Sequence, residues 1–144
     1  MLYVDTSSLL KLLLPEPESV AVQAALATED VAVVSVLTEL EAEVQLRADR
    51  LAGLLTRMQY RRLVERLATL TTQQPFDLRT LPGSLFQTAL RQHRTRETPH
   101  VRAVDRLHLA AMEELGVRRL MTHDTAQAAA AGAIGYEVVS PGRG

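Results

Sequence analysis

Four acidic residues of this chain stand among apolar neighbours, where carboxylates could bind a cation: Asp5, Glu41, Asp105 and Asp124. An ionised carboxylate is rarely buried unless it is paired, hydrogen-bonded or bound to a metal ion. Four such positions spread along one chain suggest a common purpose. We therefore interpret them as the ligands of one divalent metal site and as catalytic residues.

Two of these acids directly follow predicted strands. Asp5 comes after the apolar run at 2–4, and Asp124 comes shortly after the run at 118–121. In parallel sheets, ligands collect at the carboxyl ends of the strands, so both side chains are expected at one rim. Each acid also precedes a predicted helix and could simply cap it. Because Glu41 and Asp105 stand at no predicted cap, the set of four favours a shared site.

The predicted helix over 36–51 carries three glutamates, of which the apolar periodicity selects Glu41. Glu43 precedes Arg47 by four residues, a spacing typical of surface ion pairs, and Glu39 lies on no apolar stripe. The stripe that includes Glu41 is expected to face inward and consists of Leu37, Leu40, Val44, Ala48 and Leu51.

Asp105 shares a helical row with His108, which predicts that this carboxylate and imidazole lie within reach of each other. A single His in an apolar helix is more often a satisfied core residue than a metal ligand. Since no second His stands at metal-ligand spacing, we favour the core interpretation for His108.

The composition narrows the chemistry. The chain has no cysteine, which excludes disulfides, thiolate zinc sites and a cysteine nucleophile. Carboxylate oxygens without Cys or paired His favour Mg²⁺ or Mn²⁺ over zinc. Such ions activate water against a phosphodiester and neutralise charge on the leaving oxygen. Thr6, Ser7 and Thr122 are expected to support the acids through their hydroxyl groups.

The formal net charge is −1, so only local basic clusters point to nucleic acid. Arg57, Arg61, Arg62 and Arg66 are interpreted as a solvated helix face. A second cluster surrounds Thr98-Pro99, a predicted loop near Asp105, and consists of Arg91, His93, Arg94, Arg96, His100, Arg102 and Arg106. Four of its arginines are predicted to contact phosphate groups: Arg94, Arg96, Arg102 and Arg106.

Strands alternate with helices along the 144 residues, which predicts one α/β domain with a parallel sheet covered on both faces. The predicted strands lie at 2–4, 31–34, 118–121 and 136–139. The predicted helices lie at 9–14, 17–27, 36–51, 54–70, 81–93, 101–115 and 125–131. The two at 54–70 and 81–93 resemble a helical insertion over about 54–95. No run is suited to a membrane span, and a cytoplasmic location is expected.

The motifs in this order resemble the PIN-domain ribonucleases, in particular the VapC-type toxins of toxin–antitoxin pairs. The resemblance covers nearly the whole chain. It rests on Val-Asp-Thr-Ser-Ser at 4–8, Ser-Val-Leu-Thr-Glu-Leu-Glu at 35–41, Arg-Ala-Val-Asp-Arg-Leu-His-Leu-Ala-Ala at 102–111, Thr-His-Asp at 122–124 and Gly-Tyr-Glu-Val-Val-Ser-Pro at 135–141. Arg106 departs from the small residue often found after the family's third acid.

The resemblance implies a three-layer α/β/α PIN-like fold with a central, mainly parallel twisted sheet. It also implies a magnesium- or manganese-dependent endoribonuclease acting on structured RNA such as tRNA or rRNA. The family's acids fall on Asp5, Glu41, Asp105 and Asp124. The expected partners are the RNA, a VapB-like antitoxin and a second copy of the chain in a homodimer.

Rival functions remain. A non-catalytic RNA-binding or antitoxin-sequestering module would keep the same fold, although here all four acids are present. A phosphoacceptor receiver domain needs a Lys late in the chain, whereas the only Lys is Lys11. A haloacid-dehalogenase-like phosphatase would need an Asp where Ser7 stands.

Overall fold

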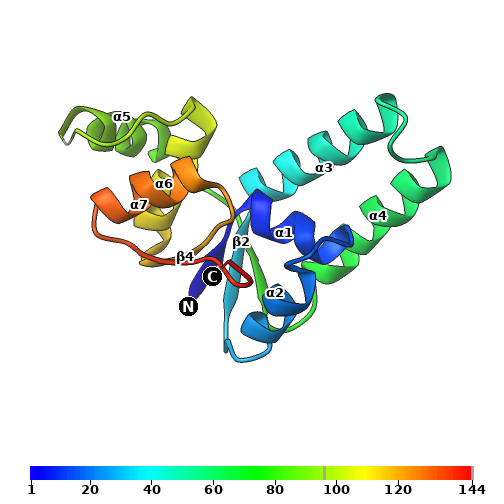
Figure 1. The fold of residues 1–144 in the computed structure, drawn as a ribbon. Coiled ribbons are helices and arrows are strands. Elements are labelled where there is room, and N and C mark those ends of the chain that lie inside the picture. Colours follow the sequence, from blue (N-terminus) through cyan, green and yellow to red (C-terminus); the bar gives the residue numbers. More distant parts are fainter. Residues whose placement is uncertain (96, 144) are drawn as a thin grey trace.

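Short apolar runs form a five-stranded sheet in which every neighbouring pair is parallel (Figure 1). The computed structural model describes residues 1–95 and 97–143. The strand order is β3-β2-β1-β4-β5, so the first strand is central. The strands are β1 (Leu2–Val4), β2 (Ala32–Ser35), β3 (Phe76–Arg79), β4 (Arg119–Met121) and β5 (Glu137–Val139).

Helices connect the strands, as parallel pairing requires. Helix α3 begins after the Ser35 cap, whose side chain accepts a hydrogen bond from the Thr38 N–H. Helix α6 ends at Leu115, and its C-cap Gly116 has a φ of 70°, the left-handed conformation that glycine adopts readily. The helices are α1 (Thr6–Leu13), α2 (Ser19–Leu26), α3 (Val36–Leu51), α4 (Arg57–Leu70), α5 (Leu85–Thr95), α6 (Ala103–Leu115) and α7 (Thr125–Ala133).

Side-chain alternation along the strands builds one core on each face of the sheet. Leu2 and Val4 pack into a core with residues of α1 to α4, whereas Tyr3 points into a core with residues of α5 to α7. Figure 1 shows these two groups of helices on opposite sides of the strands. The predicted three-layer α/β/α architecture is confirmed. The leucines of α1 belong to this architecture, since Leu9, Leu12 and Leu13 are buried in the first core.

One strand was not predicted. The range 54–95, expected as a helical insertion, contains α4 and α5 but also β3, which pairs with β2 at the edge of the sheet. The signal was present as the alternation Phe-Asp-Leu-Arg at 76–79. It is weak because an edge strand is only partly covered, and Leu78 and Arg79 are exposed here.

The predicted inward stripe of α3 is wrong for most of its members. Leu40, Val44 and Leu51 are 62%, 59% and 71% exposed. The buried side chains are Thr38, Ala42 and Leu46. The reason is visible in Figure 1, where α3 and α4 form a hairpin whose far end extends away from the sheet. Only a narrow face of α3 therefore meets the rest of the protein.

Among the described residues, no helix combines the length and the apolar composition that crossing a membrane requires.

Candidate functional site

Asp5 lies at the carboxyl end of the central strand, where it is 4% exposed. Its Oδ1 accepts hydrogen bonds from the Ser7 hydroxyl at 2.7 Å and from the Ser8 N–H at 3.1 Å, the second of which caps α1. Its Oδ2 accepts a hydrogen bond from the Thr122 hydroxyl. The carboxylate is thus held by uncharged groups alone.

This environment leaves the negative charge of Asp5 poorly compensated. Burial raises the pKa of Asp5, and the hydrogen bonds from Thr122 and Ser7 lower it again only in part. The ionised form therefore carries a desolvation cost that a nearby cation would remove. Such a perturbed carboxyl group at the end of a central strand is typical of a functional site.

Asp124 follows β4, the strand that pairs directly with β1. Its Oδ1 accepts a hydrogen bond from the Gln127 N–H at 3.0 Å, so it caps α7. The Thr122 hydroxyl accepts a hydrogen bond from the Asp124 N–H at 3.1 Å while donating to Asp5. One threonine therefore links the two strand-end acids, and capping and site formation occur together.

Glu41 approaches the same rim from α3, where it is half-buried. Its Oε1 accepts a hydrogen bond from the Thr6 hydroxyl at 2.8 Å and another from His108 Nε2. Burial acts to raise the pKa of Glu41, but the hydrogen bond and charge of His108, together with Thr6, hold it below its usual value. Glu41 is thus an ionised carboxylate with a fixed partner.

His108 is a buried residue whose two ring nitrogens both have partners. Nε2 faces Glu41, and Nδ1 lies 2.8 Å from the Tyr3 hydroxyl, which is also 2.8 Å from Ser35 Oγ. The predicted approach of His108 to Asp105 is replaced by this network. The interpretation of His108 as a satisfied core residue is confirmed, with the addition that it positions Glu41. The Tyr3–His108 contact joins residues 105 positions apart, and local sequence patterns do not reveal such a pair.

Asp105 was expected at no capping position, and this expectation is wrong. Helix α6 begins at Ala103, two residues later than predicted, which makes Asp105 its third residue. Its Oδ2 accepts a hydrogen bond from the Arg102 N–H at 3.3 Å. The Arg102 side chain also donates to Asp105, from Nε to Oδ2 at 3.1 Å and from Nη2 to Oδ1 at 3.3 Å.

Arg102 is the cation of the acidic site. Its hydrogen bond to Asp105 is the main cause of its raised pKa, and the charges of Asp105, Glu41 and Asp124 act in the same direction. Its side chain is 71% exposed, whereas that of Asp105 is 10% exposed. A largely exposed guanidinium therefore partly compensates the negative charges of Asp105, Glu41 and Asp124.

The four predicted acids are connected through shared neighbours. Thr122 joins Asp5 to Asp124, and Arg102 acts on Asp105, Glu41 and Asp124. As they stand, however, no three His, Asp or Glu side chains within the described ranges are arranged to hold a metal ion. Arg102 binds Asp105, and His108 and Thr6 bind Glu41.

The donor set nonetheless fits a hard dication. It consists of carboxylate and hydroxyl oxygens, the chain contains no thiol, and Asp5 has no cationic hydrogen-bond partner among the described residues. The cation beside Asp105 is an exposed arginine that can turn towards solvent. The three supporting hydroxyls predicted from the sequence each contact an acid of the site: Thr6 contacts Glu41, and Ser7 and Thr122 contact Asp5.

The predicted RNA-contacting arginines lie in different environments. Arg102 stands at the acidic site, and Arg94 is exposed near the end of α5. Arg106 is only 7% exposed, because it turns into the space between α5 and α6. Arg96 lies outside the described residues.

A further basic surface was not predicted as a site. A cavity of about 590 Å³ between α3 and α4 is lined by Arg47, Arg50, Arg57, Tyr60 and Arg61. The Arg50 guanidinium stacks over the Tyr60 ring at 5.4 Å from its centroid. Arg57 and Arg61 come from the cluster interpreted as a solvated helix face. Arg47 and Arg50 come from α3, and the sequence alone does not reveal that α3 and α4 pack side by side and bring these residues together.

Comparison with known proteins identifies the fold family. The family model described as the PIN domain matches residues 2–133. No curated protein matches the sequence.

Solved structures are similar over almost the whole chain. VapC20 of Mycobacterium tuberculosis, described as a sarcin-ricin loop cleaving toxin, is 20% identical with a TM-score of 0.70, over 98% of this chain and 100% of that one. FitAcB from Neisseria gonorrhoeae is 21% identical with a TM-score of 0.74, over 98% of each chain. FitAB bound to an IR36 DNA fragment is 18% identical with a TM-score of 0.70, over 99% of this chain and 96% of that one.

Proposed function

Because this chain belongs to the PIN-domain family, we propose that it is a metal-dependent endoribonuclease, the toxin of a VapBC-type toxin–antitoxin pair. PIN domains are generally nucleases. The observation that carries the proposal is the linkage of Asp5, Glu41, Asp105 and Asp124 around the carboxyl ends of β1 and β4, through shared hydroxyl groups and Arg102. The substrate is structured RNA, tRNA or rRNA, and the name of VapC20 as a sarcin-ricin loop cleaving toxin supports the second.

The proposed ligands of a Mg²⁺ or Mn²⁺ ion are the four carboxylates. When bound, such an ion activates water and neutralises charge on the leaving oxygen of a phosphodiester. Asp5 is the main anchor, because burial leaves its charge uncompensated and its orientation is fixed by Ser7 and Thr122. His108 and Thr6 orient Glu41.

Arg102 has a second proposed task. Its guanidinium lies on Asp105 but is largely exposed, so it can move to an RNA phosphate when a metal ion takes over the charge of that acid. Arg94 and Arg96 are proposed to contact the RNA backbone. The arginines that line the cavity between α3 and α4 offer a further surface for phosphates.

The proposed partners besides RNA are a VapB-like antitoxin and a second copy of the chain, in the cytoplasm. The exposed apolar residues of α3, Leu40, Val44 and Leu51, are suited to be covered by such a partner. The names FitAcB and FitAB denote relatives of the same fold, one of them bound to DNA.

One observation favours a second candidate function. Arg102 already neutralises Asp105, and no three acidic or His side chains within the described ranges are arranged for a metal ion. A non-catalytic RNA-binding or antitoxin-sequestering PIN module would have such an internally compensated site.

Incubation of the purified chain with total RNA separates the two functions. We expect discrete cuts with Mg²⁺ or Mn²⁺, mapped by sequencing the new ends, and none with a chelator. An Asp5→Asn variant should leave the RNA intact, whereas Asp30→Asn, an exposed acid elsewhere, should cut like the wild type. Retarded but uncut RNA in a gel shift would establish the binding module. Equal cutting in the presence of chelator would contradict the metal dependence.

A further inference from the structure

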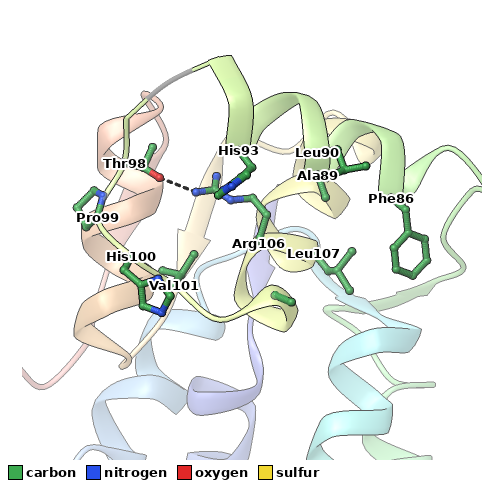
Figure 2. A pocket seen from close by; sticks show the side chains of 11 residues that line it. Phe86, Ala89, Leu90, His93, Thr98, Pro99, His100, Val101, Arg106 and Leu107 are labelled. Carbon is green, nitrogen blue, oxygen red and sulfur yellow. Dashed lines mark hydrogen bonds between the residues drawn. The ribbon is translucent and has the colours of Figure 1, made fainter.

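A second pocket lies between α5, α6 and residues 98–101 of the loop that joins them. It has a volume of about 640 Å³, within the range of small-molecule sites. Phe86, Ala89 and Leu90 line it from α5, and Leu107 lines it from α6. Figure 2 shows these side chains around an open space, with Arg106 reaching from α6 towards Thr98. The pocket is thus an apolar cavity with one permanent charge.

Arg106 is poorly satisfied for a buried cation. Its Nη2 donates a hydrogen bond to the Thr98 hydroxyl at 2.6 Å, while its Nε and Nη1 are buried without a hydrogen-bond partner. No carboxylate forms an ion pair with it among the described residues. The other titratable groups that line the pocket, His93 and His100, carry no negative charge.

This arrangement is unfavourable unless an anion completes it. Burying an unpaired charge is costly, and a guanidinium cannot escape the cost by releasing its proton at physiological pH. Consistent with that cost, burial lowers the pKa of Arg106. A carboxylate can accept two parallel hydrogen bonds along one edge of a guanidinium, here one from Nη2, which carries a second proton besides that donated to Thr98, and one from the unpartnered Nε or Nη1.

The lining defines the rest of the ligand. A free phosphate or a nucleic-acid backbone would meet one cation among mostly apolar side chains. These contacts would not replace the hydrogen bonds that the phosphate loses with water. An apolar chain attached to a carboxylate would instead contact Phe86, Leu90 and Leu107. We propose that the pocket between α5 and α6 binds a small apolar carboxylate, whose oxygens pair with the free donors of Arg106.

Hexanoate is a suitable probe, with 1-hexanol and hexyl phosphate as comparison ligands that have the same six carbon atoms but another head group. In calorimetric titrations of the wild-type chain, hexanoate should bind at least about tenfold more tightly than either, because the carboxylate alone pairs with the buried donors. Equal affinity for hexanol would overturn the role of Arg106, and tighter binding of hexyl phosphate would overturn the choice of a carboxylate.

Variants test the same assignment. Arg106→Met keeps an unbranched side chain and should reduce the advantage of hexanoate over hexanol to less than about twofold. Arg62→Met, on the exposed surface of α4, should bind like the wild type. Should Arg106→Met fail to fold, Leu90→Glu, at a half-exposed site on the pocket wall, provides an internal carboxylate and should abolish hexanoate binding.

The carboxylate could also come from an acidic side chain of a partner protein, and a peptide tests this source. A capped Leu-Glu-Leu tripeptide should bind more weakly than hexanoate if the occupant is a small molecule. Binding at least about tenfold tighter than hexanoate would replace the small ligand by an acidic segment of a partner protein, and the proposal would be wrong in that respect.

Discussion

The two halves of the acidic site hold their carboxylates in opposite ways. Asp5 is buried and receives hydrogen bonds from hydroxyl and amide groups, and burial raises its pKa. In the other half, burial is outweighed by His108 and Thr6, which hold the pKa of Glu41 below its usual value. Asp105 is paired with Arg102, whose charge also acts on Glu41. Basic side chains of the protein therefore compensate the negative charges of Glu41 and Asp105, whereas no basic side chain bonds to Asp5 among the described residues.

The difference indicates where a cation would gain most. An ion that approaches Asp5 relieves a desolvation cost, whereas an ion that approaches Asp105 must first displace a guanidinium. Loss of Asp5 should therefore have a large effect on metal binding, and changes around Asp105 should have small ones. The following predictions test that asymmetry.

The largest effect is expected for Asp5→Asn, which keeps the side-chain shape and removes the charge. RNA cleavage with Mn²⁺ should fall on the order of 1000-fold, as is common when a residue at the reacting centre is lost. The variant should also melt at a higher temperature than the wild type at neutral pH, because a buried charge disappears. Initial cleavage rates and melting curves would measure both, with Asp30→Asn as the control. A lower melting temperature would contradict the uncompensated burial of Asp5.

The next effect is expected for Thr122→Val, which removes the hydroxyl shared by Asp5 and Asp124 without changing the volume much. Supporting residues of this kind contribute about 10- to 100-fold to metal affinity, and a loss of this size is expected for Mn²⁺. Calorimetric titration with Mn²⁺ would measure it. Thr125→Val, at an exposed position in the same segment, should bind Mn²⁺ as tightly as the wild type. An equal loss of Mn²⁺ affinity in this control would show that the effect of Thr122→Val is not specific to the shared hydroxyl.

A smaller effect of opposite sign is expected for Arg102→Met. The pair with Asp105 is largely exposed on the arginine side, so its contribution is modest, and Mn²⁺ should bind about two- to fivefold more tightly without it. RNA should bind more weakly and with a reduced salt dependence, because a phosphate contact is lost. Arg62→Met is the matched control. Weaker Mn²⁺ binding by Arg102→Met would show that the arginine organises the acids rather than competing for them.

The smallest effect concerns stability as a function of pH. Since the pKa of Asp5 is raised in the folded state, its contribution is greatest below its ordinary pKa and is lost as pH rises through the raised value. The pKa of Glu41 is lowered, so its contribution is present above its ordinary value and is lost as pH falls through the lowered one. Melting temperatures of Asp5→Asn and Glu41→Gln should therefore diverge from the wild type in opposite directions as pH rises to neutral. Parallel curves would refute the asymmetry.

Much of this site could be predicted from local patterns. Asp5 and Asp124 each follow an apolar strand and precede a helix, and those short-range signals fixed their places at one rim. The hydroxyls of Thr6, Ser7 and Thr122 stand close in sequence to these acids and contact site acids in the structure.

The remainder depends on packing between distant segments. The inward side of α3 could not be chosen from its periodicity, because Leu40 and Val44 are as apolar as a core residue and yet lie on an exposed face. A shift of two residues at the start of α6 turned Asp105 into a capping residue. The burial of Arg106 depends on α5 and α6 lying side by side, which the sequence alone does not reveal.

The central claim is that carboxylates from four elements bind one hard dication, and a crystal soaked in Mn²⁺ tests it most directly. We expect anomalous density bounded by Asp5, Glu41, Asp105 and Asp124, with the Arg102 side chain turned away from Asp105. An ion bound elsewhere, or density that is absent while Arg102 stays on Asp105, would contradict the metal site and leave the non-catalytic module as the function of this chain.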